Sequence, residues 1–357
     1  MALEIDLLAV GDGTKSGDAI LIRYGDLDSG GRNQTVILID GGYKNTARDI
    51  KRILEDYYRC KNSDGKYVID LMILSHPDLD HVGGLVELSK DPEIEICGLL
   101  MQKPWEVVDP EDFKDGRITH KSLENRLRKS FKQAAELYDN VPKAKHLDTT
   151  PRCFTLNGAK FKILGPFDEF YRKMLLACPK TPDAKVIEGK AQKIFCQKIE
   201  EEDFIEGQKI EWNYDESTSE INETSLIILF EYEGHKVLLT GDAGKEALEE
   251  AIDTAQNNKI DLTDIDIIKL PHHGSRKNVT PEIMDQLGGE GTRCYISCAE
   301  GDEGHHPSKR LVNMLNQKGF RVLTTIGGDL YKGFNAPYRE EYGPAIRLDY
   351  YPTMEKL

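Results

Sequence analysis

The sequence predicts a mixed α/β protein in which two β-sheets pack face to face with helices outside. The chain falls into two halves, each with short strands followed by alternating strands and helices. Polar motifs follow the predicted strands in both halves, at the strand ends where such scaffolds place active sites. The chain has 357 residues, enough for a large core, and we expect one domain over residues 1–357.

The first half is expected to contain four strands and two helices. Its apolar or β-branched runs are separated by Gly- and Asp-rich turns, and they lie at residues 3–10, 19–24, 35–39 and 71–74. The spacing of Ile50, Ile53 and Leu54 predicts a helix over residues 46–58, and a second helix starts at Val82.

The middle of the chain departs from this pattern. A polar helix is expected over residues 121–138, and a hairpin over 154–164 turns at Asn157-Gly158, a pair that favours tight turns. Residues 168–220 are rich in Lys, Glu and Gln. They predict a charged insertion or lid that is partly helical, either a plain solvated excursion or a surface for a protein partner.

The second half resumes the regular pattern. Its strands are predicted at residues 225–232, 236–239, 265–270, 294–299, 321–325 and 345–350. Helices are expected over residues 245–255 and from Pro307 to Gln317.

Composition narrows the class of protein. The net charge of −15 argues against a broad electrostatic footprint for nucleic acid, although a few Lys or Arg side chains in a pocket could still hold a phosphate. Apolar runs such as Leu226 to Phe230 are far too short to span a bilayer. The segment Met1 to Asp6 has neither a basic start nor a long apolar core, so we expect no signal peptide and a cytoplasmic location without membrane contact. The seven cysteines contain no CxxC pair, so we expect free thiols.

The strongest motif is Ser75-His76-Pro77-Asp78-Leu79-Asp80-His81. It places two histidines and two aspartates within six residues, directly after the apolar run Leu71 to Leu74. Four potential ligands at the end of a buried strand are hard to explain as structure alone. The motif therefore predicts a metal-dependent hydrolase.

Other polar motifs also end predicted strands. They are Asp40-Gly41-Gly42, Thr240-Gly241-Asp242, His272-His273-Gly274-Ser275 and His306-Pro307. Six of the nine histidines lie in or beside the strand-end motifs, whereas histidines used for packing would scatter along the chain. We expect Asp18 and Asp40 to support loops under the site, and His305 to be an exposed bystander.

These motifs resemble those of the metallo-β-lactamase fold superfamily, and within it the soluble hydrolase domain of ComEC-type DNA-uptake proteins. The resemblance covers nearly the whole chain apart from residues 100–152 and 168–220. The matching segments are Gly17 to Ile22 with Leu38 to Gly42, Ser75 to Gly84, Asn222 to Leu226, Leu238 to Asp242, Leu270 to Ser275, and His306-Pro307. It implies a four-layer αββα sandwich of the α/β (α+β) class.

The resemblance also implies a dinuclear metal site. The implied ligands are His76 and Asp78 for the first metal, Asp80, His81 and His273 for the second, and Asp242 between the two. The family most often has His where this chain has Asp78, and another His where it has Asn222. The first site is thus richer in oxygen, and we expect two divalent ions, either Zn²⁺ or Mn²⁺.

The implied chemistry is hydrolysis by a metal-bound hydroxide. Two ions roughly 3.5–4 Å apart lower the pKa of water and stabilise the transition state. We assign catalytic roles to Asp80, to His272 as proton donor and to His306 as a second donor candidate. Which of His272 and His273 binds metal stays open, although the ligand histidine of the family usually precedes the Gly.

The leading function is a phosphodiesterase or nuclease. The candidate substrate-binding residues are Asn222, Ser275, Arg276 and Lys277. Arg276, Lys277, Lys309 and Arg310 more commonly would be surface charges. A small phosphoester, cyclic nucleotide, thioester or lactone is an alternative substrate, favoured by the acidic charge. A non-catalytic scaffold module in a larger assembly is the third possibility.

Overall fold

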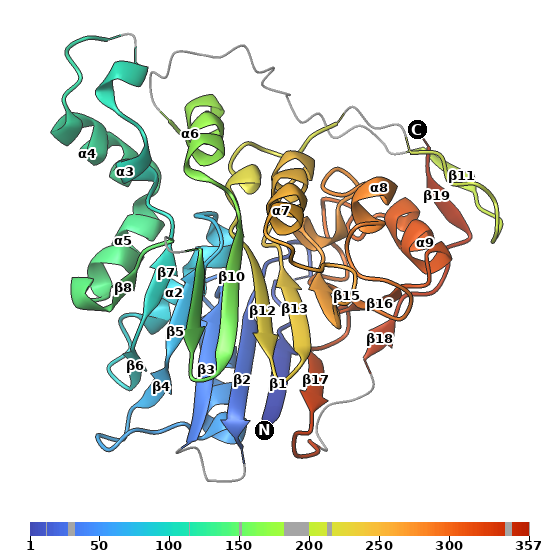
Figure 1. Ribbon diagram of the computed structural model, residues 1–357, viewed down its shortest axis with the longest axis horizontal. Helices are drawn as coiled ribbons and strands as arrows, with labels where there is room; N and C mark the ends of the chain where they lie inside the picture. The colour runs from blue at the N-terminus through green and yellow to red at the C-terminus, as the bar shows by residue number, and fades with distance from the viewer. Residues whose placement is uncertain are drawn as a thin grey trace.

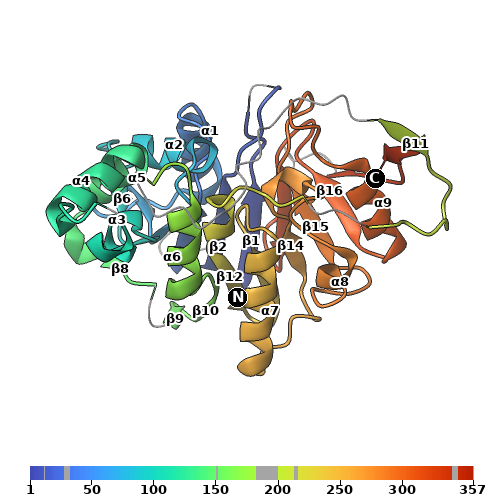
Figure 2. The same ribbon diagram turned by 90° about the horizontal axis from the view of Figure 1, so that it is seen from above.

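The two predicted sheets pack face to face in the computed structural model (Figure 1). The structure describes residues 1–11, 13–27, 33–113, 115–149, 152–181, 200–212, 216–339 and 345–356. Figure 2 places α3 to α5 on one side of the strands and α8 and α9 on the other side. The predicted fold class, an αββα sandwich, is therefore confirmed.

The first sheet has seven strands, in the order β17-β1-β2-β3-β5-β7-β8. Their bounds are β1 (Ala2–Leu7), β2 (Ile20–Asp26), β3 (Asn33–Ile39), β5 (Leu71–Leu74), β7 (Leu99–Met101), β8 (His146–Leu147) and β17 (Leu330–Phe334). From β3 to β8 the strands are parallel, so their carboxyl ends share one edge. The sequence pattern missed β17, which pairs with β1 from the far end of the chain.

The second sheet has eight strands, in the order β18-β16-β15-β14-β13-β12-β10-β9. Their bounds are β9 (Cys153–Leu156), β10 (Ala159–Gly165), β12 (Ile227–Tyr232), β13 (His235–Leu239), β14 (Ile267–Lys269), β15 (Arg293–Ile296), β16 (Arg321–Thr324) and β18 (Ile346–Arg347). The β9–β10 hairpin turns at Asn157-Gly158 as predicted, with both residues at positive φ. Two small sheets pair β4 (Tyr67–Ile69) with β6 (Ile94–Ile96), and β11 (Glu201–Asp203) with β19 (Thr353–Glu355).

Helices cover the outer faces of the large sheets. The first half carries α1 (Thr46–Ile53), η1 (Leu54–Tyr58), α2 (Leu79–Leu88), α3 (Pro104–Val107), η2 (Pro110–Asp112), α4 (His120–Ser130), α5 (Lys132–Asn140) and η3 (Lys143–Lys145). The rest are α6 (Asp168–Ala177), η4 (Asn222–Thr224), α7 (Lys245–Asn257), η5 (His272–Gly274), α8 (Pro281–Met284) and α9 (Lys309–Gln317). The single helix predicted over 121–138 is wrong. Phe131 leaves the helical region there and is buried, and α5 turns to pack on α2.

Three apolar layers hold the sandwich together. The layer between the sheets is built from alternate strand residues such as Ile5, Ile22, Phe161 and Phe230. The two outer layers lie between each sheet and its helices. Apolar side chains fill the faces of the strands, and the polar motifs lie beyond the strand ends, at the edge of the sheets.

The predicted insertion over residues 168–220 is only partly described. It begins with α6, and its later part contains β11, which pairs with β19 near the chain's end. Residues 182–199 and 213–215 lie outside the described residues. Within the described part of the chain, no helix is both long and apolar enough to cross a membrane.

Candidate metal centre

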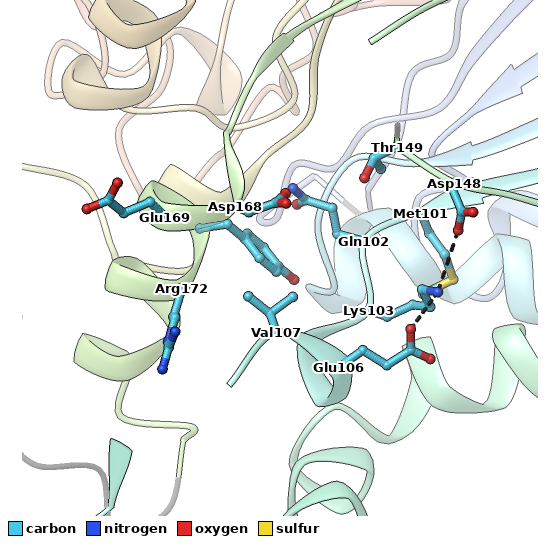
Figure 3. A pocket seen from close by; sticks show the side chains of 11 residues that line it. Met101, Gln102, Lys103, Glu106, Val107, Asp148, Thr149, Asp168, Glu169 and Arg172 are labelled. Carbon is cyan, nitrogen blue, oxygen red and sulfur yellow. Dashed lines mark ion pairs between the residues drawn. The ribbon is translucent and has the colours of Figure 1, made fainter. Parts of the chain in front are cut away.

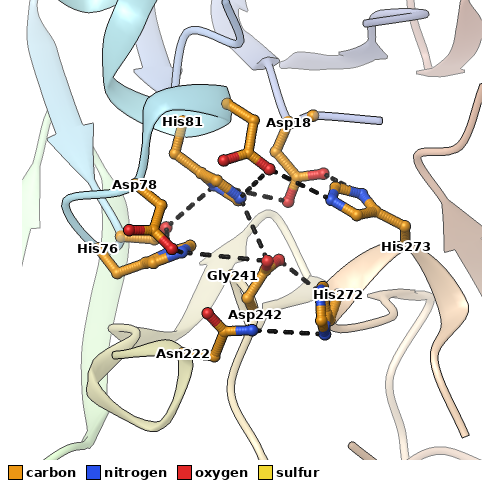
Figure 4. A network of polar contacts seen from close by, with 12 residues as sticks. Asp18, His76, Asp78, His81, Asn222, Gly241, Asp242, His272 and His273 are labelled. Atoms are coloured by element: carbon orange, nitrogen blue, oxygen red, sulfur yellow. Dashed lines mark hydrogen bonds and ion pairs between the residues drawn. The ribbon is translucent and has the colours of Figure 1, made fainter. Parts of the chain in front are cut away.

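The predicted site residues meet at one edge of the sandwich, where strands of both sheets end (Figure 4). The first sheet supplies His76 and Asp78 after β5, and the first turn of α2 supplies Asp80 and His81. The second sheet supplies the rest from the turns after β13 and β14. Residues far apart in the sequence thus converge from two sheets.

Four of these side chains form a compact set: Asp80, His81, Asp242 and His273, whose ligand atoms all lie within 4.8 Å of one another. The Nε2 atom of His81 is 3.4 Å from Oδ2 of Asp242 and 3.8 Å from Oδ2 of Asp80. Nε2 of His273 is 3.6 Å from the same oxygen of Asp80. Two ligands of a tetrahedral ion with bonds of about 2.1 Å lie about 3.4 Å apart, so the set has the dimensions of one divalent site.

Hydrogen bonds orient the two histidines of this set. Nδ1 of His81 donates to Oδ2 of Asp40 at 2.7 Å, and Nδ1 of His273 donates to the Ser297 carbonyl at 2.8 Å. Because each Nδ1 carries the proton, each Nε2 presents a lone pair to the centre. Asp40 therefore supports the site through His81, which agrees with the supporting role expected for it.

His76 and Asp78 flank the compact set. Nδ1 of His76 faces the Ser75 hydroxyl at 3.1 Å, and that hydroxyl donates to Asp40 at 2.6 Å. The hydroxyl proton is thus used, so Ser75 accepts from His76 and leaves Nε2 of His76 free. This Nε2 lies 3.9 Å from Oδ2 of Asp78 and 4.0 Å from Oδ2 of Asp242. Oδ2 of Asp242 therefore faces both His76 and His81, as a bridging oxygen would.

These residues fit a divalent cation. The Nε2 atoms of His76 and His81 are buried and have no hydrogen-bond partner, an arrangement that is costly unless a cation is bound. Although burial opposes the charged form, Asp242, Asp40 and Asp80 raise the pKa of His81 well above its usual value. A site that holds a proton this strongly also attracts a metal ion. Imidazole with carboxylate suits Zn²⁺ in the compact set, and added carboxylate suits Mn²⁺.

Asp78 has a second partner that the sequence pattern did not reveal. Lys180, just after α6, forms a hydrogen-bonded ion pair with its Oδ1. Lys180 remains half exposed, so this pair is screened by solvent. A metal at the first position would share Asp78 with this lysine.

His272 lies beside the set but is held differently. Its Nδ1 is 3.2 Å from Oδ1 of Asn278, whose amide donates to the Asp242 and Ala243 carbonyls. Burial lowers the pKa of His272 to about 4. Both His272 and His273 adopt left-handed φ angles, at 46° and 55°, a strained backbone that aims the two rings differently.

Asn222 contacts this second group rather than the compact set. Its amide donates to the Thr218 hydroxyl at 2.9 Å and lies 3.4 Å from Nδ1 of His272. The side chain predicted to bind substrate thus helps to position His272. Its place on η4 puts it next to the site, as Figure 4 shows.

His306 borders the site on the side of the second sheet. Its ring centre is 5.2 Å from that of His272, and its Nδ1 is 3.0 Å from Oδ1 of Asp302. Although burial opposes ionisation, His306 and Ser16 lower the pKa of Asp302 below its usual range. A pocket of about 680 Å³ opens beside His306, and five of its twelve lining residues are acidic: Glu201, Glu300, Asp302, Glu303 and Glu355.

The other predicted substrate contacts already have protein partners. Arg276 is 3.8 Å from Glu355, and Lys277 is 3.1 Å from Glu216. The Ser275 hydroxyl is buried and accepts from the backbone N–H of Lys277.

The expectation that Arg310 is a surface charge is wrong. Arg310 is fully buried, because its guanidinium donates to the Glu355 carbonyl and to Glu202. Lys309, its neighbour, pairs with Glu201 at 2.7 Å on the wall of the acidic pocket.

A second pocket, of about 560 Å³, lies beyond the end of β7 (Figure 3). Met101 and Gln102 border it, and Met101 pairs in register with Leu74, two residues before His76. Lys103 pairs there with Glu106 at 2.6 Å. The pocket therefore lies one strand over from the candidate metal centre.

Sequence reasoning missed Lys269 and Ser297. Lys269 is a charged residue within the apolar strand 265–270, and that contrast was a usable signal. Ser297 contributes only its backbone carbonyl, which no sequence pattern marks.

Comparisons with known proteins agree with the motifs. Residues 13–127 match the family model described as the metallo-beta-lactamase superfamily. The chain is 32% identical over 104 residues to ComE operon protein 3 of Bacillus subtilis (strain 168), which covers 29% of this chain. The chain spans about an eighth of that relative's length, because the match covers 12% of it.

Solved structures with low sequence identity are also similar. The metallo-beta-lactamase fold protein YhfI from Bacillus subtilis has a TM-score of 0.44 at 8% identity, covering 93% of this chain and 99% of YhfI. A diphosphatase from the PhnP family has a TM-score of 0.42 at 12% identity, covering 94% and 98%. Zn²⁺-bound PqqB from Methylobacterium extorquens has a TM-score of 0.43 at 10% identity, covering 92% and 99%.

The family resemblance seen in the motifs is thus confirmed by the match over residues 13–127, which include the Ser75 to His81 motif. Residues 13–127 of this chain are therefore similar to the metallo-beta-lactamase superfamily.

Proposed function

We propose that this chain is a metal-dependent phosphodiesterase with two metal positions that share Asp242. One observation carries the proposal: three imidazoles with fixed Nδ1 partners aim their Nε2 atoms into one group of carboxylates. His76 and His81 both face Asp242, and His81 and His273 both face Asp80. His81 and His273 would hold one ion with Asp80, and His76 would hold the other with Asp78.

The metal ions would supply an activated water and would stabilise the charge that develops on a phosphoryl group. The chain's own residues do the positioning. Asp40 keeps the proton of His81 on Nδ1, and Ser75 does the same for His76. Burial lowers the pKa of His272 to about 4, which disfavours it as a proton donor, so we assign proton donation to a leaving oxygen to His306 before His272. Nδ1 of His306 lies 3.0 Å from the Asp302 carboxylate, which holds the ring at the border of the site.

A small substrate is the second candidate. The acidic pocket beside His306 and the net charge of −15 would repel a long polyanion. A small phosphoester, a cyclic nucleotide, or a thioester or lactone would meet less repulsion there. The nuclease and the small-substrate enzyme differ in the length of substrate they accept.

The test combines metal analysis with a substrate panel. The metal-stripped protein is reloaded with Mn²⁺ or Zn²⁺, and metal per chain is measured by plasma mass spectrometry. Turnover is then followed on bis(p-nitrophenyl) phosphate, a cyclic nucleotide, a thioester and labelled single-stranded DNA. We compare the wild type with Asp80→Asn and with Asp261→Asn, a surface aspartate whose carboxylate binds only Thr263 among the described contacts.

We expect two metals per chain, diester turnover, and a loss on the order of 100-fold in Asp80→Asn but none in Asp261→Asn. Turnover of the diester and cyclic nucleotide without DNA cleavage would select the small-substrate enzyme. Full metal loading without turnover of any substrate would contradict the phosphodiesterase and favour the non-catalytic scaffold. A protein partner at residues 168–220 and a cytoplasmic location remain predictions.

A further inference from the structure

A lysine lies at the base of the metal centre. Lys269 is the last residue of β14, a strand with parallel neighbours on both sides in the second sheet. Side chains alternate along a strand, so Lys269 points to the same face as Ile267, into the layer between the two sheets. It is only 2% exposed. A buried ammonium in this layer needs partners close by.

Its partners are the carboxylates of the site. Nζ forms an ion pair with Oδ2 of Asp18, lies 3.8 Å from Oδ1 of Asp242, and donates to the Gly241 carbonyl at 3.0 Å. The Thr240 hydroxyl in turn donates to the Lys269 carbonyl at 2.6 Å, which fixes the backbone that carries it. Lys269 thus links a loop of the first sheet to the turn that carries Asp242.

The acidic groups form two overlapping clusters. One is the compact set of Asp80, His81, Asp242 and His273, and the other consists of Asp18, Asp40 and His81. The His81 ring stands between them, with Nε2 toward the first and Nδ1 toward the second. Both clusters have donor sets that suit a divalent ion. Lys269 contacts one carboxylate of each.

We propose that the Lys269 ammonium takes the place of a metal ion in the second cluster. Lys269 would hold Asp18 and Asp242 in place before metal binds, and it would confine metal to the first cluster. The inference rests on the metal centre of the proposed function, although not on its substrate. Three carboxylates here, Asp18, Asp40 and Asp242, are nearly fully buried. Without the ammonium, these charges would face one another across the sheets in the metal-free protein. Lys269 acts as a positioning residue and touches no substrate.

The experiment measures thermal unfolding in chelator and with saturating Mn²⁺. Lys269→Met removes the charge and keeps most of the length, whereas Lys269→Arg keeps the charge. Lys162→Met is the matched control, because Lys162 is a strand lysine of the same sheet paired with Glu231 at 2.7 Å, away from the site. Metal per chain is measured for each variant.

We expect Lys269→Met to lower the melting temperature by roughly 4–7 °C in chelator, with Mn²⁺ restoring more than half of that loss. Lys269→Arg should lower the melting temperature in chelator by less than Lys269→Met does. Lys162→Met should lower the melting temperature slightly, and by the same amount in chelator and with Mn²⁺. Should Lys269→Met not fold, Asp18→Asn with Lys269→Met removes both charges, and it should fold and bind the wild-type number of metals.

If Lys269→Met lowers the melting temperature equally with and without Mn²⁺, Lys269 only contributes to packing. That result would overturn the role assigned to Lys269 but not the metal centre. The same holds if the double variant also fails to fold. A wild-type melting temperature that Mn²⁺ does not move would instead contradict the metal centre itself, and the assignment with it.

Discussion

Asp40 offers the sharpest test of how the metal centre is assembled. Its buried carboxylate accepts from the Ser75 backbone N–H at 2.8 Å, from the Ser75 hydroxyl at 2.6 Å and from Nδ1 of His81 at 2.7 Å. Asp40→Asn preserves the shape of the side chain. An amide directed at His81 would, however, donate to Nδ1 and move the ring proton to Nε2, the atom that would bind the proposed metal.

The expected cost follows from this tautomer change. Outer contacts to a ligating histidine are generally worth 10–100-fold in metal affinity, or about 1.4–2.8 kcal/mol. We therefore expect Asp40→Asn to weaken Mn²⁺ or Zn²⁺ binding by that factor in competition titrations. Nitrogen-15 chemical shifts of the His81 ring should show the change of tautomer directly. The control is Asp70→Asn, because Asp70 accepts a backbone N–H from Val36 away from the site.

Unchanged affinity in Asp40→Asn would refute the reasoning, since the tautomer would then not depend on Asp40. An equal loss in Asp70→Asn would also count against it, because the effect would then come from general loss of packing.

Three further outcomes are expected. Burial raises the pKa of Glu223 to about 7. Between about pH 4.5 and 7 the folded protein therefore binds a proton at Glu223 that the unfolded chain does not. The contribution of Glu223 to the free energy of unfolding falls by about 3 kcal/mol as pH rises through that window. Urea unfolding of Glu223→Gln should lack this fall, and a variant that keeps the wild-type slope would show that Glu223 does not titrate there. At Gly241, with φ of 52°, an added Cβ would lie 2.9 Å from the Cβ atoms of Ser225 and Ser75; Gly241→Ala should cost about 2–4 kcal/mol in unfolding free energy and weaken metal binding through Asp242. Lys180→Met should tighten the weaker of the two metal sites severalfold in calorimetry by freeing Asp78, and an unchanged weaker site would place Asp78 outside the metal centre.

The sequence predicted the fold class and most strands because these depend on local patterns. Alternating and buried runs such as Leu71 to Leu74 report which face a strand buries, and turns such as Asn157-Gly158 report where it reverses. The break at Phe131 escaped prediction, since the polar pattern continues across it while packing of α5 on α2 decides its direction. The pairing of β17 with β1 joins the two ends of the chain, which no local pattern encodes.

By itself, the sequence predicted a group of candidate metal ligands, because His76, Asp78, Asp80 and His81 are placed by one strand end and one helical turn. Only the tertiary structure decided how these side chains are oriented and which cation offsets the charge of the nearby carboxylates. His273 rather than His272 enters the compact set because of the strained turn after β14. This turn directs Nδ1 of His273 to the carbonyl of Ser297, the residue after β15. Lys269 reaches Asp18 across 251 positions of sequence. Such contacts depend on how two sheets pack, and strand periodicity carries no information about that packing.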